Sequence, residues 1–140
     1  MLGIELGEPY DKGKNGPGGW WLFDEPEIHL GNDVFVPDLA GWRRERMPEL
    51  PEDAYFSLEP DWVCEVLSAS TVRLDRTVKM PLYGTYGVSY IWLVDPIART
   101  LEAFELKDGQ WVLLATLSEE QTVNVPPFDA IEFSLSDLWA

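Results

Sequence analysis

The chain has 140 residues, which fits one domain over residues 1–140 with a single substantial core. Its hydrophobic content of 46%, with seven tryptophans, excludes a disordered chain, and its formal net charge of −15 disfavours nucleic-acid binding unless basic residues gather locally. No apolar run approaches the ~18–20 residues of a membrane helix, and a single cysteine, Cys64, cannot form an internal disulfide, so we expect a cytoplasmic protein with no membrane partner.

The first half of the chain predicts a hairpin between two irregular segments. Residues 1–19 are typical of a helix end followed by a glycine-rich loop, which includes Lys14 and Asn15 and lacks the ending of a phosphate-binding P-loop. Residues 20–30 and 34–42 predict two antiparallel strands joined by a turn at Gly31-Asn32-Asp33. The proline-rich stretch 43–60 indicates an irregular excursion.

Residues 62–67 predict a short buried strand with one charge, Glu65, in its middle. Burying an unpaired carboxylate costs several kcal/mol or forces it to take up a proton. Glu65 therefore needs a cation, a hydrogen-bond network or a metal. Ser68, Ser70 and Thr71 then offer helix caps.

The second half predicts a crossover helix and further strands. The helix spans about 71–86, and Pro81 should kink or restart it. Strands follow at 90–94, at 101–106 and 111–117 as a second hairpin, and near Ile131 to Phe133, before a C-terminal helical turn. A helical crossover makes its flanking strands parallel whereas hairpins are antiparallel, so we expect a mixed sheet in an α/β or α+β domain.

Three carboxylates could converge on this sheet. With a turn centred on Asn32, Asp38 falls roughly opposite Glu27, and directly paired residues point to the same face. If the Glu65 strand lies beside the Asp38 strand, all three meet. Such clusters repel unless a divalent cation neutralises them, and one or two carboxylates plus water are the usual Mg²⁺ ligands.

The helix adds a cation to this group. Asp75, Lys79 and Tyr83 share one face, and Lys79 could reach the end of the Glu65 strand to orient water or stabilise charge. Each feature also has an ordinary structural interpretation. Asp38 after Pro37 is typical of a turn, Glu65 could face solvent at a sheet edge, and Lys79 could form only a helix-surface pair with Asp75.

Other chemistry-bearing residues favour structural roles. His29 is the only histidine, which disfavours histidine triads and multi-histidine zinc sites. Cys64 adjoins Glu65 and points to the opposite face, which favours a buried thiol. The tryptophans, Trp139 among them, indicate core and sheet-face packing. The basic residues form two clusters, Arg43–Arg46 and Arg73–Lys79, each following one of the acidic positions.

Several stretches together resemble the bacterial Uma-two family, which is similar to restriction endonucleases of the PD-(D/E)XK fold. The resemblance covers nearly all of the chain after about residue 18. Its residues are Trp20 to Gly31, Val36 to Arg43, Asp61 to Ser68, Asp75 through Lys79, Tyr83, and Tyr90 to Pro96.

The resemblance implies an αβββαβ core with extra C-terminal strands and a Mg²⁺-dependent (or Mn²⁺-dependent) hydrolysis of phosphodiesters. It implies Asp38 and Glu65 as metal ligands and catalytic residues, and it makes Lys79 the family's lysine. The general nuclease lysine, two residues after the acid, is here replaced by Leu67. The resemblance also implies an N-terminal helical region that this chain enters part-way, so we expect a domain that is N-terminally short relative to the family.

We therefore expect an endonuclease acting on nucleic acid, with DNA as the expected substrate, in which Glu27 and Asp75 are further site residues. A homodimer is the expected assembly. The alternative is a catalytically inactive domain of the same fold that serves binding or assembly.

Overall fold

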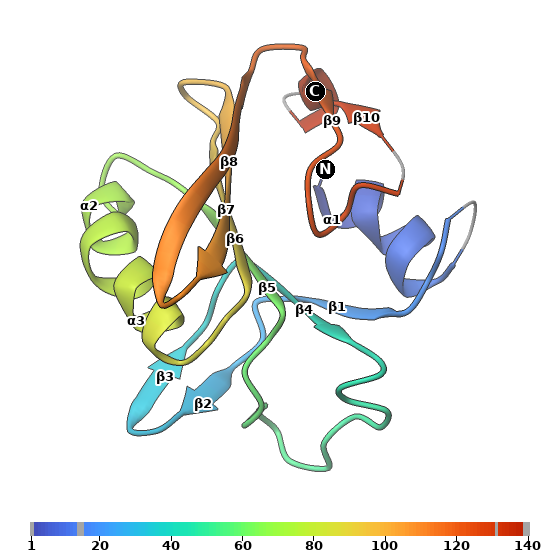
Figure 1. Cartoon of the computed structure of the whole chain (residues 1–140), viewed down its shortest axis with the longest axis vertical. Helices are drawn as coiled ribbons and strands as arrows, with labels where there is room; N and C mark the ends of the chain where they lie inside the picture. Colours follow the sequence, from blue (N-terminus) through green and yellow to red (C-terminus); the bar gives the residue numbers. More distant parts are fainter. Residues whose placement is uncertain (1, 14–15, 131, 139–140) are drawn as a thin grey trace.

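The computed structural model describes residues 2–13, 16–130 and 132–138. Its centre is a strongly twisted six-stranded sheet in the order β1-β4-β5-β6-β7-β8 (Figure 1). The strands are β1 (Trp20–Asp24), β4 (Leu39–Arg43), β5 (Trp62–Val66), β6 (Tyr90–Asp95), β7 (Thr100–Lys107) and β8 (Gln110–Ser118). Neighbours pair antiparallel except β5 and β6, which are parallel. The sheet is therefore mixed, as predicted.

The first predicted hairpin is broken into two pairs of shorter strands. β1 pairs with β4 in the main sheet, whereas β2 (Ile28–Leu30) pairs with β3 (Asp33–Phe35) as a separate ribbon. The break falls where Glu25 adopts a φ of 48° and where Pro26 and Pro37 cannot donate to a ladder. The predicted turn at Gly31 is confirmed, with a φ of 59° there.

The crossover between β5 and β6 is one continuous helical segment made of three parts. α2 (Val72–Leu74) is followed by a π-helical turn (Asp75–Lys79) and by α3 (Met80–Thr85). The Met80 N–H donates to the Asp75 carbonyl, five residues back, immediately before Pro81. The predicted restart at Pro81 takes the form of a widened turn, after which α3 begins at Met80 with Pro81 in its first turn, where a missing N–H costs least.

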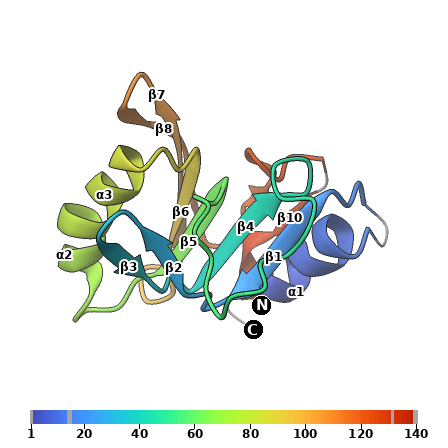
Figure 2. The same ribbon diagram turned by 90° about the horizontal axis from the view of Figure 1, so that it is seen from below.

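The remaining elements cover the other face of the sheet. They are α1 (Leu2–Leu6), a π-helical turn (Gly7–Asp11), the pair β9 (Thr122–Val123) and β10 (Phe133–Ser134), and a 3₁₀ turn (Leu135–Leu138). Figure 2 shows α2 and α3 on one side of the sheet and α1 and β10 on the other. The predicted strand near Ile131 corresponds to β10, although Ile131, Lys14, Asn15 and Trp139 lie outside the described residues. None of the described helices is long and apolar enough to cross a bilayer.

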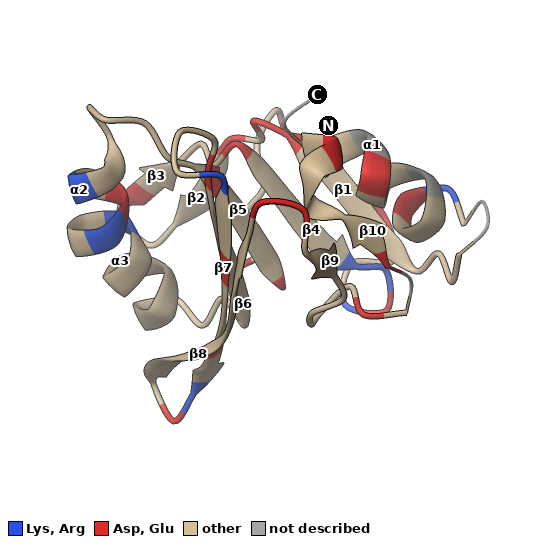
Figure 3. Cartoon of the chain, turned by 90° about the horizontal axis from the view of Figure 1, so that it is seen from above, with Lys and Arg blue, Asp and Glu red and all other residues tan. Residues whose placement is uncertain are grey.

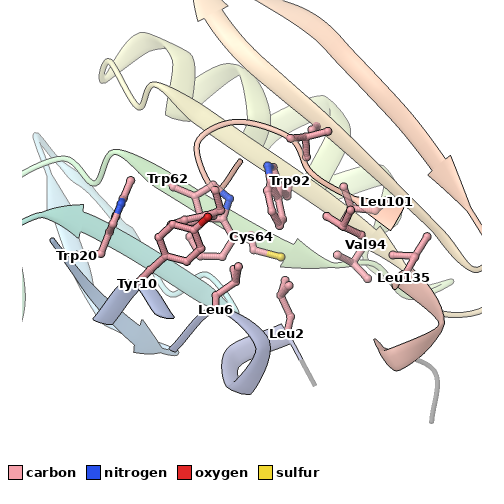
Figure 4. Packing of buried hydrophobic residues seen from close by; sticks show 14 residues of the cluster. Leu2, Leu6, Tyr10, Trp20, Trp62, Cys64, Trp92, Val94, Leu101 and Leu135 are labelled. Atoms are coloured by element: carbon pink, nitrogen blue, oxygen red, sulfur yellow. The ribbon is translucent and has the colours of Figure 1, made fainter. Parts of the chain in front are cut away.

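Two cores result, one on each face, because side chains alternate along the strands. In β5, Trp62 and Cys64 join the cluster under α1, where Trp62 meets Trp92 edge to face with 5.4 Å between ring centroids. Figure 4 shows side chains of α1 pointing toward Cys64. Val63 and Leu67 join the cluster under α2 and α3. Glu65 falls on this second face, between two core residues.

Ile91 tests how much the second core contributes, because it is fully buried near the start of β6. We expect Ile91→Ala to reduce the free energy of unfolding by about 2–5 kcal/mol through lost burial and a residual cavity. Ile97→Ala is the matched control, since Ile97 is 80% exposed, and its effect should stay within about 0.5 kcal/mol. Urea unfolding measures both, and equal effects of the two variants would contradict this account of the core.

Candidate active site

Asp38 and Glu65 are placed side by side by strand register. The β4–β5 pairing matches Leu39 with Cys64, so one step further Asp38 lies opposite Glu65. The Asp38 N–H donates to Glu65 Oε1 at 3.2 Å, and the Val66 N–H donates to Asp38 Oδ2 at 2.6 Å. The two carboxylates thus continue the ladder where the backbone pairing of β4 and β5 ends. Like charges placed directly opposite each other repel, so this pair needs a cation.

Lys79 supplies that cation from the π-helical turn. Its Nζ donates to Glu65 Oε2 at 2.8 Å and lies 3.2 Å from Asp75 Oδ1. The side chains of Glu65 and Asp75 are only 3% and 2% exposed, whereas that of Lys79 is 30% exposed. One ammonium at the rim therefore serves two buried carboxylates.

Burial sets the protonation of Glu65. Desolvation raises the pKa of Glu65 from its ordinary 4.5 to about 7, the hydrogen bond and charge of Lys79 oppose this rise, and the charges of Asp75 and Asp38 add to it. For Lys79 burial alone would lower the pKa, but the hydrogen bonds and charges of Glu65 and Asp75 outweigh it and raise the pKa. Lys79 therefore stays cationic, whereas Glu65 changes between its protonated and ionised forms near neutral pH.

Burial and the same carboxylates also raise the pKa of two neighbouring groups, the Tyr83 hydroxyl and the Cys64 thiol. Burial first, and then the charges of Glu65, Asp75 and Asp38, raise the pKa of the Tyr83 hydroxyl. Burial, followed by the charges of Glu65 and Asp38, raises the pKa of the Cys64 thiol. Cys64 is fully buried in the core on the opposite face of the sheet. The thiol is therefore a packed, protonated side chain and not a nucleophile.

A cleft of about 160 Å³ opens over these groups. At roughly 30 Å³ per water it holds about five waters, enough for a hydrated ion. Its lining residues are Val36, Asp38, Glu65, Val66, Ser68, Thr71, Asp75 and Lys79. A larger hollow of about 410 Å³ lies between α1 and β1, next to Asp11 and Asp24. We place the site at the smaller cleft, because the larger hollow contains neither the acid pair nor Lys79.

The expectation that Glu27 faces Asp38 is wrong. The register places Glu25 opposite Asp38, with the Glu25 N–H donating to the Asp38 carbonyl at 3.0 Å. The Glu27 carboxylate instead pairs with the His29 ring at 2.8 Å and does not line the cleft. The left-handed Glu25 and the breaks beside it shift the strands away from a simple hairpin. The Glu27 carboxylate therefore lies apart from the cleft that Asp38 and Glu65 line.

The basic clusters are largely neutralised by carboxylates. Arg44 pairs with Asp11 at 2.8 Å, and Arg46 pairs with both Glu59 and Asp61. Figure 3 shows the basic positions of the helical crossover, which runs from α2 through the π-helical turn, lying next to one another. In this segment Arg76 pairs with Glu102 on β7. Few basic groups near the cleft are therefore free to meet an anion.

The donor set suits a hard divalent cation held by two carboxylates. Among the described residues, no three side chains of His, Cys, Asp or Glu come together as a metal-binding group. The pair itself fits Mg²⁺, which is held through one or two carboxylates and keeps several waters. Within the described part of the chain Asp38 Oδ1 accepts no hydrogen bond, so it offers a free ligand atom.

Two hydroxyl residues of the cleft were expected only as caps. Ser68 and Thr71 line it, and their hydroxyls hydrogen-bond each other at 2.9 Å. Thr71 occupies the N-cap position without a side-chain capping bond. Their place directly after the buried strand was the available signal, since residues at the carboxyl end of such a strand border its cleft.

Comparison with known proteins relates this arrangement to nucleases. A family model named Uma2 and described as "Putative restriction endonuclease" matches residues 11–136. A crystal structure of "a putative nuclease belonging to DUF820" from Anabaena variabilis is similar, with a TM-score of 0.69 and 24% identity. The match covers 86% of this chain and 68% of that one, and at this identity it supports the fold alone. A search of curated proteins finds no match.

The raised pKa of Glu65 predicts a pH-dependent stability. The folded state holds the Glu65 proton more tightly than the unfolded chain, so this contribution is full below pH 4.5 and is lost as the pH rises through about 7. We expect the unfolding free energy of the wild type, relative to Glu65→Gln, to fall by about 3 kcal/mol over that range. Urea unfolding at several pH values measures it, and parallel curves for the two proteins would contradict the assignment.

Proposed function

Because the chain belongs to the Uma2 (Uma-two) family, we propose that it is a metal-dependent nuclease of the PD-(D/E)XK type that hydrolyses phosphodiester bonds in DNA. The observation that carries the proposal is the meeting of Asp38 and Glu65 on adjacent strands, with the Lys79 ammonium 2.8 Å from Glu65. Two acids and a lysine in one cleft are what metal-assisted phosphodiester hydrolysis needs.

Asp38 and Glu65 would hold Mg²⁺ or Mn²⁺ in this proposal. When bound, the ion lowers the pKa of a coordinated water and neutralises charge on the phosphate. Asp38 contributes its free Oδ1, and Glu65 contributes a carboxylate that ionises near neutral pH. The cleft of about 160 Å³ leaves room for water beside both carboxylates, which suits attack by water.

Lys79 would act on the water and the phosphate. Its cationic Nζ, at the rim of the cleft, orients the attacking water and stabilises the negative charge that develops on the phosphoryl oxygens. The water gives up a proton to solvent as its oxygen bonds to phosphorus, the bond from phosphorus to one sugar oxygen breaks, and that oxygen takes up a proton from solvent. The general nuclease pattern has its lysine at the position of Leu67, which here is a buried core residue. In this proposal Lys79 takes over the role of that lysine.

DNA has to approach a chain with a net charge of −15. Support for local contact comes from the crossover helix, where Arg73 is exposed and has no ion pair among the described residues. Arg73 and Lys79 would meet phosphates beside the cleft, and binding should weaken steeply with salt. The cytoplasmic location expected from the sequence stays a prediction.

Cleavage of plasmid and oligonucleotide DNA tests the function. We expect activity with Mg²⁺ or Mn²⁺ that disappears with chelator, and its loss in Asp38→Asn and Glu65→Gln. Lys79→Met should lower turnover by about 10²–10³-fold without weakening metal binding, because it acts on the transition state. Glu27→Gln is the matched control, and it should cleave like the wild type.

Two outcomes would contradict this proposal. Full cleavage by Glu65→Gln would assign the activity to another site. A wild type that binds Mn²⁺ yet cleaves neither DNA nor RNA would favour the alternative, an inactive domain of this fold that serves binding or assembly.

We propose that two copies of the chain pair through β8 as a homodimer. β8 is an edge strand of nine residues that carries no charge, and within the described part of the chain it pairs only with β7. Natural edges are usually protected by charges or proline. On so acidic a chain, an uncharged edge is where a second copy meets the least repulsion. Val112 and Leu113 are also 39% and 50% exposed there.

Light scattering after size exclusion tests the dimer. We expect the mass of two chains for the wild type and of one chain for Leu113→Lys, because two like charges would face each other across the symmetric edge. Ile97→Lys is the control, since it adds the same charge at an exposed position away from β8. A monomeric wild type at high protein concentration would rule out the edge pairing.

A further inference from the structure

Orphaned polar atoms cluster on the helix that carries Lys79. Three buried side-chain atoms in the described part of the chain have no hydrogen-bond partner, namely Trp62 Nε1, Asp75 Oδ1 and Tyr83 OH. Two of the three belong to the crossover helix. Asp75 is 2% exposed and Tyr83 is fully buried. A buried polar group left unmatched costs about 1–3 kcal/mol. Asp75 Oδ1 still has an ion-pair partner, the Lys79 ammonium at 3.2 Å, although that contact is not a well-formed hydrogen bond.

The position of Lys79 explains the orphan on Asp75. The Nζ atom lies 3.2 Å from Asp75 Oδ1, but its hydrogen bond goes to Glu65 Oε2 at 2.8 Å. A small shift of the ammonium away from Glu65 would bring it onto Asp75. The ammonium thus lies between the two carboxylates, hydrogen-bonded to Glu65 and within ion-pair distance of Asp75.

Metal binding would require that shift. Both oxygens of Glu65 are engaged, Oε1 by the Asp38 N–H and Oε2 by Lys79. A cation bound to Glu65 would repel the ammonium beside it and compete for the same oxygen. Asp75, whose Oδ1 already lies 3.2 Å from the Lys79 Nζ, is the nearest alternative acceptor for the ammonium.

We propose that Asp75 is a positioning residue which receives the Lys79 ammonium when a divalent cation takes its place on Glu65. Lys79 thus neutralises the acid pair in the metal-free protein and moves to Asp75 in the loaded one. This inference rests on the proposed function, since it needs a cation at Asp38 and Glu65. It adds a role for Asp75 that acts through Lys79 and not on the metal.

Mn²⁺ binding to four proteins tests the exchange, namely the wild type, Asp75→Asn, Lys79→Met and the double variant. Calorimetry at about pH 8 keeps Glu65 ionised. We expect Asp75→Asn to weaken Mn²⁺ binding about tenfold in the wild type, because Lys79 then has nowhere to go. In the Lys79→Met background the same change should cost less than about threefold, since no ammonium has to move.

A purely electrostatic role of Asp75 gives the opposite pattern. Without Lys79 to shield it, Asp75 would attract the ion more strongly, so its removal would cost as much or more in the Lys79→Met background. That result would overturn the exchange while leaving the metal site intact. Glu102→Gln, which removes a carboxylate paired with Arg76 on the same helix, is the control and should leave binding unchanged.

A measurement on the wild type avoids any dependence on variant folding. The chain has four lysines, Lys12, Lys14, Lys79 and Lys107, so ¹⁵N-lysine labelling gives few side-chain signals and Lys79→Met assigns one of them. We expect Mg²⁺ to shift the Lys79 ammonium signal and to leave that of Lys107 in place. Mg²⁺ binding without any change at Lys79 would disprove the exchange, and no binding of either metal would disprove the proposed function together with it.

Discussion

The ion pair between Glu65 and Lys79 is the interaction on which the site depends. β5 is buried on both faces, and the crossover helix covers the face to which Glu65 points. A carboxylate in that position is tolerated because an ammonium and a backbone N–H meet its two oxygens. The same burial raises its pKa to about 7, so near neutral pH the carboxylate is either protonated or ionised and paired with Lys79. Burial of Glu65 is thus the reason both for its ion pair with Lys79 and for its raised pKa.

The two-faced sheet explains why the site lies where it does. α1 and the C-terminal segments fill one face with apolar side chains, and α2 and α3 fill the other except at the end of β5. There the backbone pairing of β4 and β5 stops, and the side chains of Asp38 and Glu65 take its place. These polar groups thus gather where the ladder between β4 and β5 ends and leaves the N–H groups of Asp38 and Val66 to satisfy.

Much of this was readable in the sequence, and the failures have physical reasons. The apolar run around Glu65, the crossover helix and the parallel β5–β6 pair follow from patterning and handedness. The broken first hairpin does not, because it depends on a left-handed Glu25 and on two prolines that act together. Because of this break, Glu25 lies opposite Asp38, where the prediction from a simple hairpin placed Glu27. The widened turn before Pro81 could not be predicted from the sequence pattern either. Only the backbone shows that the Met80 N–H donates to a carbonyl five residues back and not four.

The crossed bonds between Asp38, Glu65 and the ends of β4 and β5 have an evolutionary consequence. Each carboxylate fills a backbone donor as well as offering a ligand atom, so selection for folding alone would keep both acids after catalysis was lost. Lys79, at the rim, carries no such second duty toward the ladder. It does, however, neutralise the buried Glu65, so selection for folding would retain the lysine as well as the acids, and an intact trio in a relative would be a poor guide to activity.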